Sequence, residues 1–219
     1  MQHRRQFMKG AAALTAGCLG LNHFANPLFA APSSSPFAED LLNIRPLEGY
    51  SPNMGVLVAM LNYNRSTIIR SIKNLKVEEL DFLIDPKANT IGALVLHLGA
   101  VDKFYQINSF EGRQQFNDAE KKEWDAAMRL GDKGRAEIKG HDAQWYIDKI
   151  TAVRQKTLNE LKKRDDQWLF AVDPLWSNAK DGKINTYWKW FHVCEHESNH
   201  RGQITWLKGR LPGAKGGGD

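Results

Sequence analysis

The chain has 219 residues, of which 42% are hydrophobic and 25% charged, and its formal net charge at pH 7 is +5. This balance is typical of a globular protein and excludes a low-complexity or collagen-like chain, and two cysteines exclude a disulfide-rich scaffold. No face rich in Lys and Arg with interleaved aromatic residues stands out, so we expect no nucleic-acid partner.

The N-terminal segment, residues 1–30, has the features of a twin-arginine export signal. Arg4 and Arg5 precede an Ala-rich apolar core at residues 10–21, which is too short for a standard membrane span. Ala30 offers a small residue for cleavage, and removal of the segment lowers the formal charge from +5 to +2. We therefore expect a periplasmic protein. A basic disordered arm is the alternative, but it would not carry this apolar core.

A second alternative concerns Cys18. The run Leu-Thr-Ala-Gly-Cys18 partly resembles a lipoprotein cleavage box, although Thr15 stands where a bulky aliphatic residue is usual. We rank lipid anchoring second, and only in that case do we expect attachment to a membrane. After cleavage at Ala30 only Cys194 remains, so no intramolecular disulfide is expected.

The remaining chain predicts one domain at residues 51–211, preceded by a Pro- and Ser-rich tether (31–50) and followed by a disordered tail (212–219). Helices are expected at residues 52–75 and at about 90–110, the second capped by Asn89 or Thr90. The sequence Asn117-Asp-Ala-Glu120 is typical of a capping box and predicts a short helix to residue 130.

Two further long helices are expected at about residues 141–164 and from residue 186 to before Pro212, with an irregular segment at 165–185 between them. No strand pattern is convincing. Four long helices joined by long excursions predict an all-α fold, a four-helix bundle.

The last of these helices contains His192, His196 and His200 at successive four-residue steps. At about 100° per residue, His196, Val193, Ile204 and other apolar residues fall within about 40° of His200. Two imidazoles therefore lie within the apolar stripe, where a polar group needs a partner. Residues four apart on a helix have Cβ atoms about 5–6 Å apart, so the pair can bind one divalent metal.

A third imidazole is available from the second long helix, where His97 is central to an apolar face formed by Ala93, Leu94, Val101 and their neighbours. Ordinary buried histidines that bind no metal are the alternative. We expect His97, His196 and His200 to be the metal ligands, with Gln203 and His192 on the flank of the stripe as candidates to orient a ligand. Cys194 lies about 120° from His200 and is not an expected ligand.

Two motifs resemble the DinB/YfiT-like superfamily of metalloenzymes. The run from His196 to Ile204 (HESNHRGQI) is similar to the motif that ends the fourth helix of that bundle, and residues 90–102 (TIGALVLHLGAVD) are similar to its helix-two motif. The resemblance covers about residues 52–211 and implies that His97, His196 and His200 are the family's metal-binding triad. Asn199 departs from the pattern, because many members have an additional His there.

The resemblance implies metal-dependent transfer chemistry in which a small thiol is activated. Three neutral imidazoles leave a divalent ion its full charge and open positions, and Zn, Ni and Fe all fit nitrogen-only ligands. A metal-dependent transferase or hydrolase that activates a thiol or water is therefore our first hypothesis, with a small thiol or an anion as substrate. A protein that binds metal or a small ligand without catalysis, or holds a structural metal, is the alternative. A homodimer is compatible with either.

Overall fold

The structure is a computed structural model that describes residues 41–178 and 182–214. The predicted export signal (1–30), the first part of the predicted tether (31–40) and the end of the predicted tail (215–219) lie outside the described residues.

Every regular element in the described ranges is a helix, with two isolated β-bridges in the segment before the last helix. The predicted all-α fold is confirmed. The long helices are α1 (Pro52–Ile72), α3 (Ile91–Glu111), α6 (Ala143–Leu161) and α8 (Thr186–Lys208), and the short ones are α2 (Val77–Leu80), α4 (Asp118–Arg129), α5 (Gly131–Glu137) and α7 (Asp166–Phe170).

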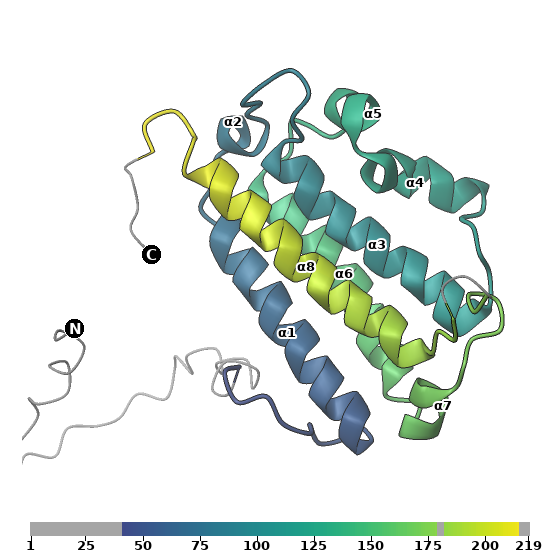
Figure 1. Cartoon of the computed structure of the whole chain (residues 1–219). Helices are drawn as coiled ribbons and strands as arrows, with labels where there is room; N and C mark the ends of the chain where they lie inside the picture. The colour runs from purple at the N-terminus through teal and green to yellow at the C-terminus, as the bar shows by residue number, and fades with distance from the viewer. Residues whose placement is uncertain (1–40, 179–181, 215–219) are drawn as a thin grey trace, which may run out of the picture. The chain divides into compact units, whose positions relative to one another are not determined.

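The four long helices form a bundle of two parallel pairs (Figure 1). Helices α1 and α8 run in the same direction, because Asn64 donates to the carbonyl of Cys194 and Lys208 donates to the carbonyl of Ser71. Helices α3 and α6 also run in the same direction and are the most closely packed pair. The chain reaches α6 through a long crossover that carries α4 and α5, which lie beside α3 in Figure 1.

Side-chain caps explain where several helices begin. Thr90 accepts a hydrogen bond from the Ala93 N–H at the start of α3, so Thr90 and not Asn89 is the cap. Asn117 and Glu120 form the predicted capping box of α4. Each cap satisfies backbone N–H groups that have no partner within the helix.

The first helix takes its cap from a distant part of the chain. The Asp166 carboxylate, at the start of α7, accepts hydrogen bonds from the Met54 N–H, from the Asn53 backbone and side chain, and from the Ser51 hydroxyl. These bonds hold the pKa of Asp166 at about 2, despite the opposing effect of desolvation. The short α7 therefore holds the start of α1 in place.

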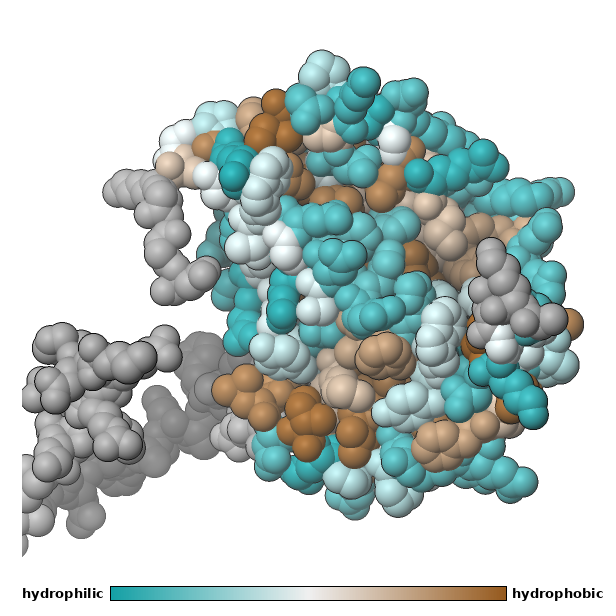
Figure 2. All heavy atoms as spheres, viewed as in Figure 1, coloured by the Kyte–Doolittle hydropathy of each residue, from teal (hydrophilic) through white to brown (hydrophobic). Residues whose placement is uncertain are grey.

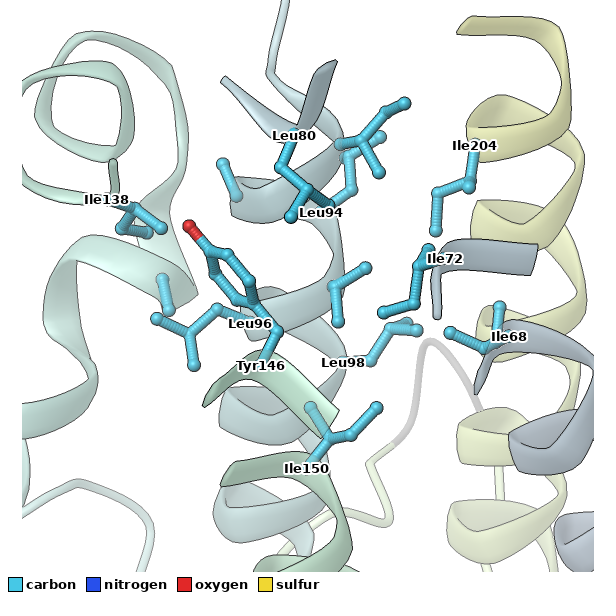
Figure 3. Close-up of a cluster of buried hydrophobic side chains, with 14 of the residues drawn as sticks. Ile68, Ile72, Leu80, Leu94, Leu96, Leu98, Ile138, Tyr146, Ile150 and Ile204 are labelled. Atoms are coloured by element: carbon cyan, nitrogen blue, oxygen red, sulfur yellow. The ribbon is translucent and has the colours of Figure 1, made fainter. Parts of the chain in front are cut away.

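Two apolar clusters fill the bundle along its length. One contains the ends of α1 and α8 and the first half of α3 and of α6, and Figure 3 shows Ile68, Ile72, Tyr146 and Ile204 within it. The other lies toward the start of α1 and of α8 and is built around Met54, Leu57, Leu61, Tyr105 and Trp190. Burial of these side chains supplies the main stabilisation of the fold.

Between the clusters lies a charged layer, which we define as Arg65, Asp102, Arg154 and Glu197, one residue from each long helix. All four are at most 5% exposed. The Arg154 Nε donates to Asp102 at 2.7 Å and its Nη2 donates to Glu197 at 2.8 Å, while the Arg65 Nε donates to Glu197 at 3.0 Å. The layer pairs two guanidinium groups with two carboxylates and links all four long helices.

The face in Figure 2 is mainly hydrophilic, with brown, hydrophobic residues gathered toward its lower edge. None of the helices in residues 41–178 and 182–214 has the combination of length and apolar composition needed to span a membrane.

Four elements differ from the sequence prediction: α1 in its end, and α2, α5 and α7 because no helix was expected there. The first long helix ends at Ile72, a few residues before the expected end. The stretch between the helix predicted to end at residue 130 and the one predicted from about residue 141 contains α5, and the segment expected to be irregular begins with α7. Helices as short as α2, α5 and α7 contain too few residues to show a periodic pattern, so they could not be predicted in this way.

Candidate metal centre

Three imidazoles meet between α3 and α8. His97 comes from α3, and His196 and His200 come from consecutive turns of α8. The Nε2 atom of His196 lies 3.3 Å from the Nε2 of His97 and 3.2 Å from the Nε2 of His200. One nitrogen from each ring lies within 4.8 Å of the others, a spacing that suits three ligands of one ion. His97 and His200 are only 9% and 8% exposed.

Hydrogen bonds on the far side of two rings determine their tautomers. The Nδ1 of His97 lies 2.8 Å from the Ala127 carbonyl, and the Nδ1 of His200 lies 2.9 Å from the Gln203 Oε1. The Ala127 carbonyl can only accept, so the Nδ1 of His97 carries the hydrogen, and with the Gln203 Oε1 facing His200 the Nδ1 of His200 carries one as well. The Nε2 atoms of His97 and His200 therefore present lone pairs toward His196.

The His196 ring cannot pair with the lone pairs of both His97 and His200 at once. His196 has a buried Nδ1 without a hydrogen-bond partner among the described residues, and its Nε2 can donate to only one of the two lone pairs that face it. If Nε2 carries no hydrogen, three lone pairs converge. A cation among the three Nε2 atoms would relieve this repulsion, so the donor set fits a divalent metal.

The surroundings keep the imidazoles neutral. Burial lowers the pKa of His97 to about 4, against the effect of its bond to Ala127. Burial and the neighbouring His200 and His97 lower the pKa of His196 to about 3. Burial also lowers the pKa of His200, partly offset by its bond to Gln203. A metal binds neutral imidazole, so no proton has to leave at neutral pH.

The packing of α8 explains why its imidazoles face inward. Val193, Ile204 and Leu207 are buried on the same stripe of the helix. Glu197 follows His196 directly and is held by both guanidinium groups of the charged layer. These contacts fix the rotation of α8 about its axis and direct His196 and His200 toward α3.

The two flanking candidates differ in position. Gln203 touches the cluster through His200, as described above. His192 lies further away: its Nδ1 bonds to Glu195, its ring stacks on Trp188, and its centroid is 5.8 Å from that of His196. Cys194 is buried away from the cluster against Asn64, and burial raises the pKa of its thiol.

A depression of about 480 Å³ lies next to Gln203, the hydrogen-bond partner of His200, and none of the three histidines lines it. It is bordered by Gln203, by Leu94 one turn before His97, and by the half-exposed Trp206 indole. The remaining lining residues are Ile84, Asp85, Ala88, Asn89, Asn199, Gly202 and Leu207. The mixture of amides, a carboxylate, aliphatic groups and an aromatic ring suits a small amphiphilic molecule.

Two features of the centre were absent from the sequence prediction. The Ala127 carbonyl orients His97, but a backbone group leaves no trace in a residue pattern. The sequence does contain one indication of the charged layer. Arg65 lies four residues after Leu61 and three before Ile68, so it falls on the buried stripe of α1.

The comparison with known proteins agrees with the geometry. The family model for mycothiol S-transferase matches residues 56–213, a range that contains all three histidines of the cluster. No curated protein matches the chain. The chain belongs to the mycothiol S-transferase family, within the DinB-like superfamily of helical proteins.

Proposed function

We propose that the protein is a metal-dependent S-transferase that uses a small thiol. The observation that carries this proposal is the convergence of three neutral imidazoles, in which the Nε2 of His196 lies 3.3 Å from that of His97 and 3.2 Å from that of His200. Membership of the mycothiol S-transferase family supports a thiol as the substrate. His97, His196 and His200 are the proposed ligands.

A divalent cation bound there would supply Lewis acidity, which lowers the pKa of a nearby thiol or water. The chain itself would perform three tasks. It keeps the imidazoles unprotonated through burial, it orients His97 and His200 through the Ala127 carbonyl and Gln203, and it leaves the three ligands without a charged partner. Asp102 and Glu197 are engaged by arginines and leave the cation its full charge.

The depression beside Gln203 is the proposed binding place of the non-reacting part of the thiol. Asn199 and Gln203 can contact polar groups there, and Trp206 offers an aromatic surface. Substrate held in this depression would lie next to Gln203, on the Nδ1 side of His200, and its thiol would extend past this ring to reach the Nε2 atoms. Positioning of this kind raises the effective concentration of the reacting sulfur.

The metal is zinc, nickel or iron in this proposal, because nitrogen-only ligands accept all three. We also propose export by the twin-arginine route, which carries folded proteins and suits a chain that takes up its metal before export. Lipid attachment at Cys18 is the second option. The mass of the mature N-terminus separates them: a chain beginning at Ala31 excludes the lipid.

The test uses the full chain loaded with Zn²⁺ or Co²⁺. Wild-type protein should bind about one ion per chain, and His200→Ala should lose it. His192→Ala is the matched control, since His192 lies on the same helix outside the cluster and should keep the ion. Addition of a small thiol should change the visible spectrum of the Co²⁺ form and should support transfer to an electrophile.

Three outcomes would contradict the proposal. Wild-type protein without bound metal removes the centre itself. A Co²⁺ spectrum that no thiol changes indicates a closed, structural site. A spectrum that thiol changes, without transfer to any electrophile, indicates a binding protein without catalysis.

A further inference from the structure

The helix of the crossover breaks sharply next to the imidazole cluster. Leu130 ends α4 and precedes α5, and its φ of 55° and ψ of −146° make it the only residue other than glycine with a positive φ in the described ranges. A residue with a side chain rarely adopts a backbone conformation of this kind, because it is strained. Surrounding contacts must therefore hold it.

The break changes the hydrogen bonding of one carbonyl. In a continuous α-helix the carbonyl of Ala127 would accept from the N–H of residue 131, four positions later. Here the Gly131 N–H donates instead to the Asn89 side chain at 3.1 Å. The Ala127 carbonyl is left to accept from His97 Nδ1 at 2.8 Å.

The two hydrogen bonds form an exchange between the crossover and the start of α3. Asn89 lies directly before Thr90, the cap of α3, and His97 lies two turns into the same helix. Asn89 accepts a hydrogen bond from the Gly131 N–H, which in a continuous helix would bond to the Ala127 carbonyl. His97 then donates to that carbonyl. Without Asn89, the Gly131 N–H would be unpaired or would compete with His97 for the Ala127 oxygen.

From this exchange we infer that Asn89 is a positioning residue for His97. Its side-chain oxygen binds Gly131, stabilises the bend at Leu130 and keeps the Ala127 carbonyl free for His97 Nδ1. The carbonyl then fixes the Nδ1–H tautomer and directs the Nε2 lone pair toward His196. The effect on metal affinity rests on the proposed function, whereas the effect on the His97 tautomer does not.

The first measurement uses metal-free protein, in which nitrogen-15 NMR of the imidazoles reports which nitrogen of His97 carries the hydrogen. Wild type should show hydrogen on Nδ1, and Asn89→Ala should lose this preference. Asn89→Asp keeps an acceptor oxygen at the same distance and should restore it. If the alanine variant does not fold, Asn89→Ser replaces it. The serine oxygen is one bond closer to the backbone, so it falls short of the Gly131 N–H and the Nδ1–H preference should again be lost.

The second measurement is the affinity for Zn²⁺ by competition with a chromophoric chelator. Loss of a group that orients a metal ligand weakens binding about 10–100-fold, and we expect this for Asn89→Ala. Asn89→Asp should remain within a few-fold of wild type. Leu130→Gly should also keep its affinity, because glycine adopts the bend without strain.

Asn117→Ala is the matched control for stability. It removes one side-chain acceptor from the opposite end of α4, so it should lower the melting temperature without changing the affinity or the tautomer. The inference is overturned if folded Asn89→Ala keeps both the Nδ1–H tautomer and wild-type affinity. If wild type binds no metal but Asn89→Ala still changes the tautomer, the proposed function fails and the positioning role stands.

Discussion

Replacement of Glu197 by Gln tests the charged layer with little change of shape. The Glu197 Oε1 accepts from the Nε and Nη2 of Arg65 and from the Nη2 of Arg154, whereas its Oε2 has no hydrogen-bond partner in the part of the chain that the structure describes. A glutamine can keep its oxygen toward the guanidinium groups and place its amide nitrogen where Oε2 was. The substitution therefore removes a charge while most of the packing remains.

The magnitude follows from burial. Glu197 is 1% exposed and Asp102 is fully buried, so the layer is formally neutral and has almost no contact with water. Glu197→Gln leaves one buried positive charge uncompensated, which costs about 3–5 kcal/mol. For a domain of this size about 2–4 °C is lost for each kcal/mol, so the melting temperature should fall by about 6–20 °C.

Thermal unfolding followed by circular dichroism measures this difference. Glu123→Gln is the matched control: Glu123 pairs with Lys149 at 3.0 Å with both side chains well exposed, and its loss should cost less than about 1 kcal/mol. Adding Arg65→Met to Glu197→Gln removes one charge of each sign and should recover part of the loss. Equal melting temperatures for Glu197→Gln and Glu123→Gln would refute the reasoning.

Three further predictions concern groups that are buried in the fold. Zinc affinity should change little between pH 8 and pH 6, because the pKa values of His97 and His196 are about 4 and about 3; calorimetric release of a full proton at pH 6 would contradict this. Acid should unfold the metal-free protein as the pH falls below about 6.5 toward about 4, since the unfolded chain binds protons there that the folded chain does not, and a melting temperature constant across this range would oppose it. The thiol of Cys194 should react with a disulfide reagent far more slowly in folded than in urea-unfolded protein, because it is buried and its pKa is raised; equal rates would contradict its burial.

The sequence predicted the part of the centre that depends on periodicity. Four-residue spacing places His196 and His200 on one face of a helix, and the apolar neighbours of His97 identify its face in the same way. The family resemblance then implied that the two helices lie side by side. Periodicity cannot show this, because it carries no information about the distance between segments. The caps at Thr90 and Asn117 were also readable, since their chemistry is local.

What escaped prediction depends on backbone conformation or on contacts between distant segments. The bend lies at Leu130, although Gly131 is the residue that a sequence reader would choose for a positive φ, and both adopt one. Asp102 shares its helix with His97, but its partners Arg154 and Thr157 lie more than 50 positions away. Such pairings follow from the packing of whole helices, and no local pattern encodes them.

The carboxylate of Asp166 has a consequence for the order in which the protein is made. Helix α1 leaves the ribosome first, yet the group that completes its opening turn is synthesised 113 positions after Asn53. Until Asp166 is synthesised, the first N–H groups of α1 lack their carboxylate acceptor, and the apolar face of α1 lacks the later helices against which it packs. A polypeptide that ends before α7 should therefore need a chaperone to remain soluble. The full-length chain supplies the Asp166 carboxylate that caps its own first helix.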